Sequence, residues 1–269
     1  MAYNFDFIRE KYQYTEEEEG RFGGSRASGL EAHYTQKQLD LLVGKHSCVL
    51  ELGCATGYYG FYLADKCHDY LGIDIVPENV ECFSQKIKES NYSNLSVKLG
   101  DATCLDFIES DSYDVVLVLG PMYHLPQKER KLVFEESIRV CKPGGKICYA
   151  YISVLGLYAG ACTVCPEEYP NAYTNERVFM NGLDDLRPDL FFETTPEEME
   201  QSAKEHGLCI IKNVGLDFLF AANLINNMTE EQFAAWMVLN DRMAESVYCT
   251  GLSNHALLIC GKQKELNDV

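Results

Sequence analysis

The spacing of apolar residues along this chain changes near residue 48. Residues 30–42 carry apolar side chains at helical spacing, so we expect residues 1–47 to be helical and peripheral. Beyond them, short apolar runs alternate with helix-patterned segments, which favours a parallel α/β sheet. The run at 113–119 is almost continuously apolar, as expected of a strand buried on both faces. The expected strands are 48–52, 70–74, 95–99, 113–119, 146–152, 208–214 and 255–261, and the expected helices are 58–66, 77–89, 128–140 and 196–206.

Short motifs mark the ends of several of these elements. Pro77 stands in the first turn of its expected helix, where proline is favoured. Thr194 or Thr195 precedes Pro196 and two glutamates, a pattern that caps a helix and places negative charge at its positive end. Lys142-Pro-Gly-Gly145 predicts a turn before the next strand. The alternation of strands and helices between these signals predicts a doubly wound α/β fold.

Two segments interrupt this alternation. Residues 153–195 mix glycine, proline and aromatic residues without a clean period, and a long irregular segment in a compact fold is usually functional or mobile. Residues 217–250 have helical character. We therefore divide the chain into an N-terminal helical lid (1–47), a cofactor-binding core (48–152), a substrate-cap insert (153–195) and a C-terminal part of the core (196–269) that carries the helical insert 217–250.

The chain is acidic, with a formal net charge of −18 over 269 residues. Nucleic-acid binding usually rests on a positive face, and no cluster of Lys or Arg is visible, so we expect a small neutral or cationic ligand instead. No run reaches the roughly 18 apolar residues of a membrane span, and the first residues lack the pattern of a secretory signal. We therefore expect a cytoplasmic protein whose twelve cysteines are reduced. Cys162 and Cys165 supply only two of the four ligands that zinc takes, so no metal site is expected.

A glycine-containing loop follows the first expected strand. It reads Glu51-Leu-Gly-Cys-Ala-Thr-Gly57, and its two glycines allow the backbone to approach a ligand closely and to turn sharply into a helix. A dinucleotide-binding loop in this register has three glycines, where this chain has Gly53, Ala55 and Tyr58. A tyrosine at the helix start would crowd a pyrophosphate. The spacing therefore argues against a nicotinamide cofactor and for a ligand with an amino-acid moiety at this loop.

Aspartates follow at the next two strand ends. Asp74 is placed to accept hydrogen bonds from both hydroxyls of a ribose, and Asp101 is placed to accept one from the exocyclic amine of adenine. The fourth strand ends in Leu119-Gly-Pro-Met-Tyr-His-Leu125. Ligands of open α/β sheets bind beyond the carboxyl ends of the strands, so these loops should share one edge. The structural alternatives are that Asp74 forms a turn at the strand end and that Asp101 caps a short helix.

Taken together, these segments resemble the successive motifs of the class I S-adenosylmethionine-dependent methyltransferases. The resemblance covers residues 28–152 and, more weakly, the stretch near residues 253–255. The Gly-Pro-Met-Tyr-His-Leu segment resembles a bacterial subgroup of that family. The resemblance implies a Rossmann-like seven-stranded sheet with an antiparallel last strand, S-adenosyl-L-methionine as cofactor, and methyl transfer as the activity. It rests on Glu51–Gly57, Asp74, Gly100–Ala102, Tyr113-Asp114 and Arg139–Gly145.

The resemblance also implies roles for individual residues. The glycine loop would line the methionine part of the cofactor with Glu51 near the amino group, Asp74 would hold the ribose, and Asp101 the adenine. The Leu119 backbone would lie near the sulfonium. Ala55 stands where the family usually has glycine, a mild departure, and Glu51 has the alternative of a simple surface charge. The residues implied to bind the cofactor are Glu51, Gly53, Ala55, Gly57, Asp74, Ile75, Asp101, Ala102 and Leu119.

Methyl transfer is an in-line displacement on a sulfonium, so positioning and exclusion of water can supply most of the rate. An oxygen or nitrogen acceptor must also lose a proton. We expect His124 to be the catalytic base, because histidine titrates near neutral pH, and Tyr123 to orient the acceptor or pack on the cofactor. The alternative for His124 is a hydrogen bond to the backbone that shapes its loop. The expected acceptor is a small molecule; a protein or RNA methyltransferase, an NAD(P)-dependent oxidoreductase and a non-catalytic binding protein are the alternatives, and a homodimer is left open.

The acceptor pocket is expected from the N-terminal lid and the two inserts. Arg26 and His33 are expected either to close over the cofactor or to lie on solvated surface. The acidic run Glu16–Glu19 is expected on a solvated helix face. The aromatic candidates for the pocket, several of them expected to be ordinary core, are Tyr12, Tyr14, Tyr151, Tyr158, Tyr173, Phe191 and Trp236.

Overall fold

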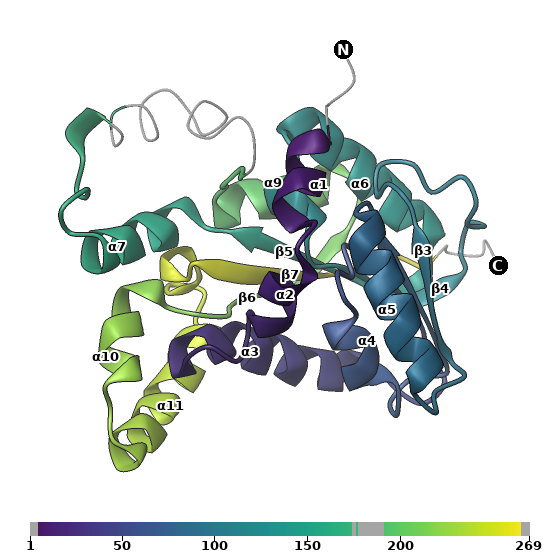
Figure 1. Cartoon of the computed structure of the whole chain (residues 1–269). Coiled ribbons are helices and arrows are strands. Elements are labelled where there is room, and N and C mark those ends of the chain that lie inside the picture. The colour runs from purple at the N-terminus through teal and green to yellow at the C-terminus, as the bar shows by residue number, and fades with distance from the viewer. Residues whose placement is uncertain (1–4, 174–175, 177–190, 265–269) are drawn as a thin grey trace.

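A seven-stranded sheet forms the centre of the part of the chain that the computed structural model describes, which is residues 5–173, 176 and 191–264 (Figure 1). The strand order is β3-β2-β1-β4-β5-β7-β6. β7 runs antiparallel to β5 and to β6, whereas the other neighbouring pairs are parallel. The strands are β1 (Cys48–Leu52), β2 (Asp69–Asp74), β3 (Leu95–Leu99), β4 (Tyr113–Val118), β5 (Cys141–Ile152), β6 (Cys209–Gly215) and β7 (His255–Gly261).

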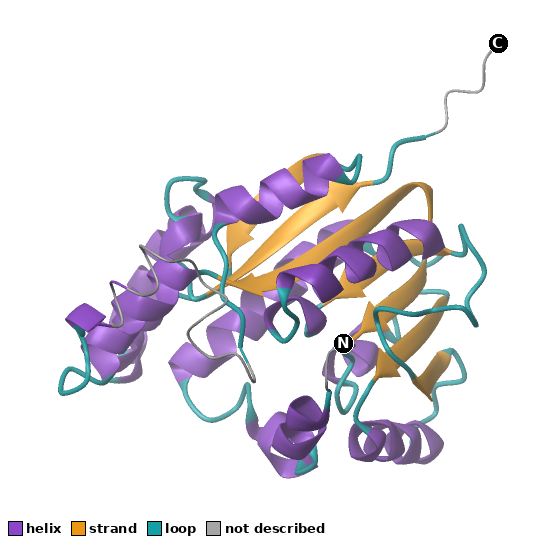
Figure 2. Cartoon of the chain, turned by 90° about the horizontal axis from the view of Figure 1, so that it is seen from above, coloured by secondary structure: helices purple, strands orange, loops and turns teal. Residues whose placement is uncertain are grey.

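Helices cover both faces of the sheet (Figure 2). One face packs against α3 (Arg26–Leu42), α4 (Tyr58–Leu63), α5 (Pro77–Glu89) and α11 (Glu230–Glu245). The other face packs against α6 (Gln127–Val140) and α9 (Pro196–Glu205). This arrangement confirms the doubly wound α/β fold with an antiparallel last strand. Further α-helices among the described residues are α1 (Asp6–Tyr12), α2 (Thr15–Gly20), α7 (Val154–Val164) and α10 (Ala222–Asn226).

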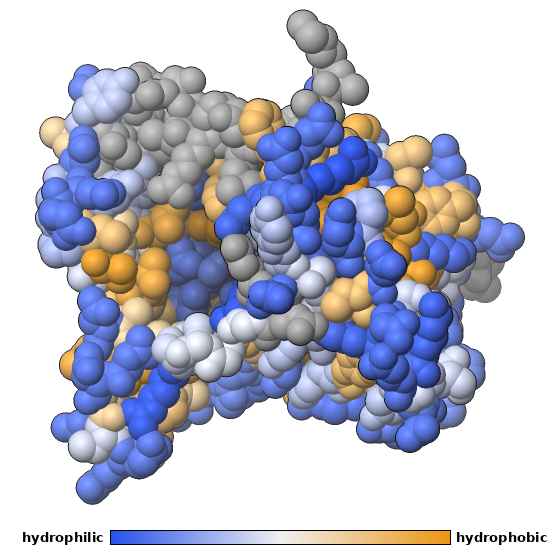
Figure 3. All heavy atoms as spheres, viewed as in Figure 1, coloured by the Kyte–Doolittle hydropathy of each residue, from blue (hydrophilic) through white to orange (hydrophobic). Residues whose placement is uncertain are grey.

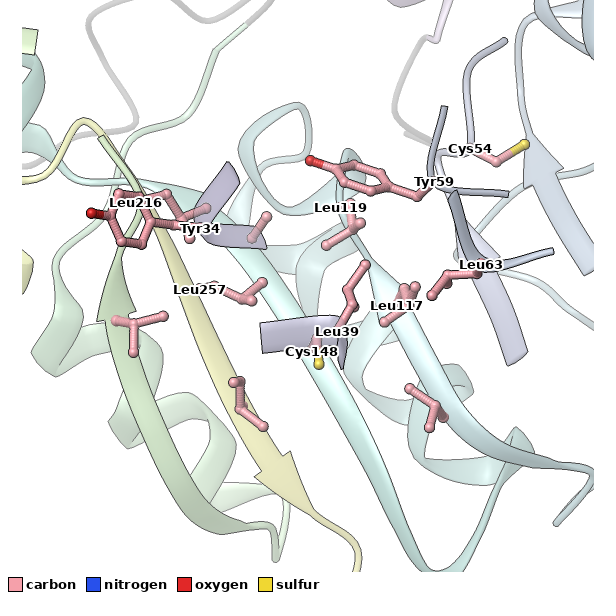
Figure 4. Packing of buried hydrophobic residues seen from close by; sticks show 14 of the residues in the cluster. Tyr34, Leu39, Cys54, Tyr59, Leu63, Leu117, Leu119, Cys148, Leu216 and Leu257 are labelled. Atoms are coloured by element: carbon pink, nitrogen blue, oxygen red, sulfur yellow. The ribbon is translucent and has the colours of Figure 1, made fainter. Parts of the chain in front are cut away.

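Alternate residues of the central strands enter two separate apolar layers. In β4, Leu117 belongs to one layer and Val116 to the other, and both side chains are fully buried. Figure 4 shows the first layer, in which Leu117 and Leu257 of the sheet pack with Leu39 of α3 and Leu63 of α4. Burying a large apolar side chain stabilises a fold by roughly 1.5–3 kcal/mol. The continuous apolar runs of the sequence are therefore explained by burial on both faces of the sheet.

Several sequence-based expectations match the structure residue for residue. The expected elements at 48–52, 77–89, 95–99 and 255–261 have the observed bounds of β1, α5, β3 and β7. Pro77 stands at the first turn of α5. Thr195 caps α9: its side chain accepts a hydrogen bond from the Glu198 backbone N–H in a capping box.

The turn expected at Lys142–Gly145 is wrong, because these residues lie within β5. The ladder between β4 and β5 is irregular at this point: Tyr113 pairs with Cys141, whereas Val115 pairs with Lys146. The additional residues on the β5 side bulge out of register, with Gly144 at a φ of 82°. The Pro-Gly-Gly sequence thus bends a strand instead of ending one.

The segment 153–195 is more regular than expected where the structure describes it. It opens with α7, which packs against the 3-10 helix η3 (Leu219–Ala221). The sequence of α7, VLGLYAGACTV, has no charged residue, so it lacks the polar stripe that reveals an amphipathic helix. Residues 174–175 and 177–190 of this insert lie outside the described residues.

The helices of the two inserts lie at one end of the sheet, on the left in Figure 1. The second insert, expected at 217–250, is helical as expected and contains η3, α10 and α11. Among the described residues, no helix combines the length and the apolar character needed to cross a bilayer. The division of the chain into lid, core and caps stays a prediction.

Candidate cofactor-binding site

A pocket of about 1100 Å³, counted to its open mouth, lies at the carboxyl edge of the sheet. Its walls come from the loops that follow β1, β2, β3 and β4 and from the N-terminal helices. The sheet therefore brings together residues that are up to about seventy positions apart in the sequence. The predicted site residues that line the pocket are Glu51, Gly53, Ala55, Asp74, Ile75, Asp101, Ala102, Leu119, Tyr123 and His124.

Glycine is required at two positions of the loop after β1. Gly53 has a φ of 78°, and a Cβ there would lie 2.9 Å from Cδ of Pro121, so glycine lets this loop pack on the loop after β4. Gly57 has a φ of 90° and caps α4, and its Cβ would lie 2.2 Å from Cδ2 of Phe83. Gly57 is not among the residues that line the pocket; it makes room for the packing of α5. Ala55, with a φ of 46°, adopts a left-handed conformation that costs a non-glycine residue about 1–2 kcal/mol.

Asp74 is buried at the end of β2 and organises the loops on both sides of it. Its Oδ2 accepts a hydrogen bond of 2.7 Å from the Ala55 N–H, and its Oδ1 accepts one of 2.9 Å from the Val76 N–H. Burial raises the pKa of this carboxyl, against the opposing effect of these hydrogen bonds. Asn79 lies beside the same part of the pocket, and its buried Oδ1 has no hydrogen-bond partner among the described residues. An unpartnered acceptor next to a carboxylate fits the hydroxyls of a ribose.

Asp101 forms a turn instead of capping a helix. Its Oδ1 accepts hydrogen bonds of 2.8 Å from both the backbone N–H and the hydroxyl of Thr103, and Asp101 pairs with Cys104 in an isolated bridge. No helix begins in the segment after it, residues 102–112, all of which the structure describes. The helix-cap alternative is therefore wrong, and the turn presents Asp101 and Ala102 to the pocket.

Glu51 is 2% exposed, so the surface-charge alternative is wrong. The hydroxyl of Tyr70 donates a hydrogen bond to its Oε2. Burial raises the pKa of Glu51 to about 8. A cation beside such a carboxyl lowers its pKa and so favours the ionised form. Glu51 is therefore suited to the ammonium group of an amino-acid moiety.

The N-terminal helices cover the pocket. Ile8 and Tyr12 of α1 line it, and Nε of Arg9 donates a hydrogen bond of 3.4 Å to the Ile75 carbonyl. Glu18 of α2 was expected on a solvated face, but its side chain is 13% exposed and lines the pocket. Burial raises the pKa of Glu18 above its usual value. Nη1 of Arg21 lies 4.0 Å from Oε2 of Glu18, so the two side chains form an ion pair.

His124 and Tyr123 lie where the pocket meets α1. A hydrogen bond of 3.0 Å joins Nε2 of His124 to the hydroxyl of Tyr12, and the two rings meet edge to face. The hydroxyl of Tyr123 donates a hydrogen bond of 2.8 Å to the Leu119 carbonyl. The Phe191 ring lies 5.1 Å from the His124 ring. Of the aromatic candidates for the acceptor pocket, Tyr12 and Phe191 thus lie at this site.

Other candidates lie elsewhere. Arg26 donates hydrogen bonds to the Met228 carbonyl and the Glu230 carboxylate, so it ties α3 to the second insert and does not line the pocket. His33 is exposed on α3. Tyr14 and Tyr173 are mostly exposed, and Tyr151 is fully buried in the core. Tyr158 packs edge to face with Tyr169, and Trp236 packs against the core cluster.

Sequence reasoning missed an ion pair on the inner wall. Nη2 of Arg21 lies 2.9 Å and 3.1 Å from the two carboxylate oxygens of Glu31, and both residues line the pocket. The two residues lie on different elements, and neither belongs to a motif. Only the packing of α3 against the sheet edge reveals that they face the predicted site.

Known proteins share both the sequence pattern and the fold of this chain. A family model described as a methyltransferase domain matches residues 49–145. Nodulation protein S of Sinorhizobium fredii (strain NBRC 101917 / NGR234) is 32% identical over 158 residues, which cover 56% of this chain and 71% of that protein. Methyltransferase GfsG of Streptomyces halstedii is 27% identical over 135 residues, 49% of this chain and 47% of GfsG. The chain thus spans about half the length of the first curated relatives that it matches.

The fold agrees with these matches. Magnesium protoporphyrin IX methyltransferase (ChlM) from Synechocystis PCC 6803, solved with bound SAH, superposes with a TM-score of 0.63 at 13% sequence identity. The superposition covers 97% of this chain and all of that chain. The sequence motifs, the sheet order and the pocket at its carboxyl edge agree with these relationships. The chain belongs to the class I S-adenosylmethionine-dependent methyltransferases.

Proposed function

We propose that this chain binds S-adenosyl-L-methionine across the carboxyl edge of its sheet and transfers the methyl group to a small-molecule acceptor. The observation that carries the proposal is the convergence of Asp74, Asp101 and the Gly53 loop on one pocket, from the ends of three strands. Asp74 and Asn79 accept from the ribose hydroxyls, and Asp101 with Ala102 meets the adenine. Glu51 and the Gly53 loop hold the methionine part.

The chain's own residues supply positioning and exclusion of water. The bound cofactor contributes an electrophilic methyl group on a sulfonium. Ile8 and Tyr12 cover the pocket from α1, which shields this end of the site from solvent. Tyr123 is held by its bond to the Leu119 carbonyl, so the loop after β4 presents Tyr123 and His124 as a fixed pair. Fixed groups of this kind lower the entropic part of a displacement barrier.

The small-molecule acceptor is favoured by charge and by enclosure. The formal net charge of −18 disfavours RNA. The N-terminal helices line the pocket with Ile8, Tyr12 and Glu18, which favours a small acceptor over a polypeptide. The cytoplasmic location stays a prediction, and protein or RNA acceptors and a homodimer stay alternatives to be tested separately.

Calorimetry with S-adenosylhomocysteine and with NADH tests the proposal. We expect S-adenosylhomocysteine to bind at least tenfold more tightly than NADH, because Tyr58 opens α4 where a pyrophosphate would need glycine. Equal or tighter binding of NADH would contradict the proposal and would indicate an oxidoreductase instead.

Replacing His124 by alanine is expected to leave S-adenosylhomocysteine affinity unchanged and to lower turnover by roughly 100-fold or more on an oxygen or nitrogen acceptor, the usual contribution of a general base. The measurement is kcat against pH for wild type and variant with any acceptor that the wild type methylates. His46→Ala is the control, because His46 is an exposed residue near the amino end of β1. A His124→Ala variant with an unchanged pH profile would rule out this role.

A further inference from the structure

A second pocket lies beside the cofactor pocket, and Arg21 and Glu31 line both. It measures about 750 Å³, counted to its open mouth. Its lining includes Asp217, which follows β6, and His255 at the start of β7. Because β7 and β6 follow β4 and β5 in the sheet order, this pocket continues the same edge beyond the cofactor pocket. The Arg21–Glu31 ion pair therefore borders both pockets.

Carboxylates converge on one point of the second pocket. Nδ1 of His255 lies 2.9 Å from Oδ2 of Asp217 and 3.6 Å from Oε2 of Glu31. The side chains of these three residues are 13–18% exposed. Arg21, the other charged residue that lines this pocket among those described, is already paired with Glu31. Carboxylates this poorly solvated stabilise a positive charge placed between them.

The pKa of His255 reflects the two carboxylates beside it. Burial by itself lowers the pKa of the imidazole, but the Glu31 and Asp217 carboxylates reverse the effect and raise the pKa above its usual value. Arg21 opposes them. The two carboxylates thus favour a positive charge beside them even at the cost of burying it.

The buried side chain of Asn254 lies beside His255. Asn254 lines the second pocket and is 7% exposed. Its Nδ2 lies 3.0 Å from Nδ1 of His255, whereas its buried Oδ1 has no hydrogen-bond partner among the described residues. Buried side-chain oxygens in folded proteins are nearly always bonded, so Oδ1 of Asn254 can accept a hydrogen bond from a donor that enters beside it.

Apolar residues also line the second pocket. They are Ala27 and Leu30 of α3 and Phe218, Leu219 and Ala222 at the start of the second insert, beside the polar Ser25, Ser28 and Asn226. Figure 3 shows apolar surface in orange on the side of the molecule where α7 and α10 lie. A ligand that satisfies both the charged and the apolar lining carries a positive head and an apolar body.

We propose that the second pocket takes the methyl acceptor and that this acceptor is a small amine with an apolar body, whose ammonium group is held by Glu31 and Asp217. The proposal rests on the proposed function. The Tyr123 ring lies 6.3 Å from the His255 ring, so a molecule anchored at Asp217 extends toward the Tyr123–His124 pair. Glu31 and Asp217 are then the residues that determine specificity.

Three probes of similar shape test the assignment: phenethylamine, which is cationic, 2-phenylethanol, which is neutral, and phenylacetate, which is anionic. Their binding is measured by calorimetry to the full chain saturated with S-adenosylhomocysteine. We expect phenethylamine to bind at least tenfold more tightly than 2-phenylethanol, and phenylacetate to bind most weakly. A charge-assisted hydrogen bond in a poorly solvated site accounts for such a preference.

Glu31→Gln and Asp217→Asn are each expected to reduce the preference for phenethylamine over 2-phenylethanol by at least fivefold. Glu135→Gln, an exposed carboxylate of α6, is the matched control and should keep the full preference. Retained S-adenosylhomocysteine binding shows that a variant is folded. Two variants are used because Asp217 also accepts a hydrogen bond from the His255 N–H, so its loss can disturb the loop.

Two results would overturn the assignment while S-adenosylhomocysteine still binds. One is the absence of any preference for the cation in the wild type, including no detectable binding of all three probes. The other is an unchanged preference in Glu31→Gln. If S-adenosylhomocysteine itself fails to bind, the proposed function fails instead, and the two outcomes are distinguished in the same titration.

Discussion

Asp74→Ala is expected to weaken S-adenosylhomocysteine binding by roughly 100-fold or more. Hydrogen bonds to a charged group contribute about 1.5–3 kcal/mol each, and two ribose hydroxyls reach this carboxylate in the proposed complex. The substitution also releases the Ala55 and Val76 N–H groups, which Asp74 holds at 2.7 Å and 2.9 Å. The affinity for S-adenosylhomocysteine should therefore fall for two reasons: the contacts to the ribose are lost, and the loop that follows β1 is less ordered. Calorimetry on the folded variant measures the change.

Asp69→Ala is the matched control for this experiment. Asp69 begins β2 and Asp74 ends it, so both aspartates belong to the same strand, but Asp69 is exposed at the opposite edge of the sheet. We expect Asp69→Ala to bind S-adenosylhomocysteine as the wild type does. If the affinity of Asp74→Ala for S-adenosylhomocysteine stays within threefold of the wild-type affinity, Asp74 does not belong to the binding site.

Gly57→Ala is expected to lower the free energy of unfolding by about 3 kcal/mol. A left-handed φ costs an alanine about 1–2 kcal/mol, and overpacking a core costs about 1–3 kcal/mol more. Both apply here, because Gly57 has a φ of 90° and its Cβ would lie 2.2 Å from the Phe83 ring. Urea unfolding followed by circular dichroism measures the loss.

Gly207→Ala is the control that measures the cost of backbone strain alone, without crowding around the new Cβ. Gly207 also has a left-handed φ, 77°, but nothing lies within 4 Å of the position of its Cβ. We expect it to lose only the strain contribution, about 1 kcal/mol. Equal losses in the two variants would show that Phe83 moves aside and that the tight packing of α5 on this loop is not required.

The fold was predictable where a local signal and burial agree. β1, α5, β3 and β7 have the expected bounds, since each combines a clear apolar run or period with a strong boundary residue such as Pro77. The sequence pattern did not predict α7, because a helix without charged residues shows no periodic alternation of polar and apolar positions. The Pro-Gly-Gly of β5 resembled a turn because a strand irregularity uses the same residue types.

The cofactor side of the site was predictable to a similar degree. Glu51, Asp74 and Asp101 stand at strand ends, and parallel strands bring their carboxyl ends to one edge whatever the loop lengths are. The acceptor side was not predictable. Glu31, Asp217 and His255 are far apart in the sequence and belong to no shared motif. Only the placement of β7 beside β6 and of α3 across the sheet edge brings them together.

A structure of the chain with bound S-adenosylhomocysteine would show whether adenosine lies across the carboxyl edge of the sheet. We expect both ribose hydroxyls within hydrogen-bond distance of Asp74 or Asn79, about 3.2 Å or less, and the adenine against Asp101 and Ala102. Adenosine bound away from Asp74, or lying outside the pocket beneath α1, would contradict this expectation.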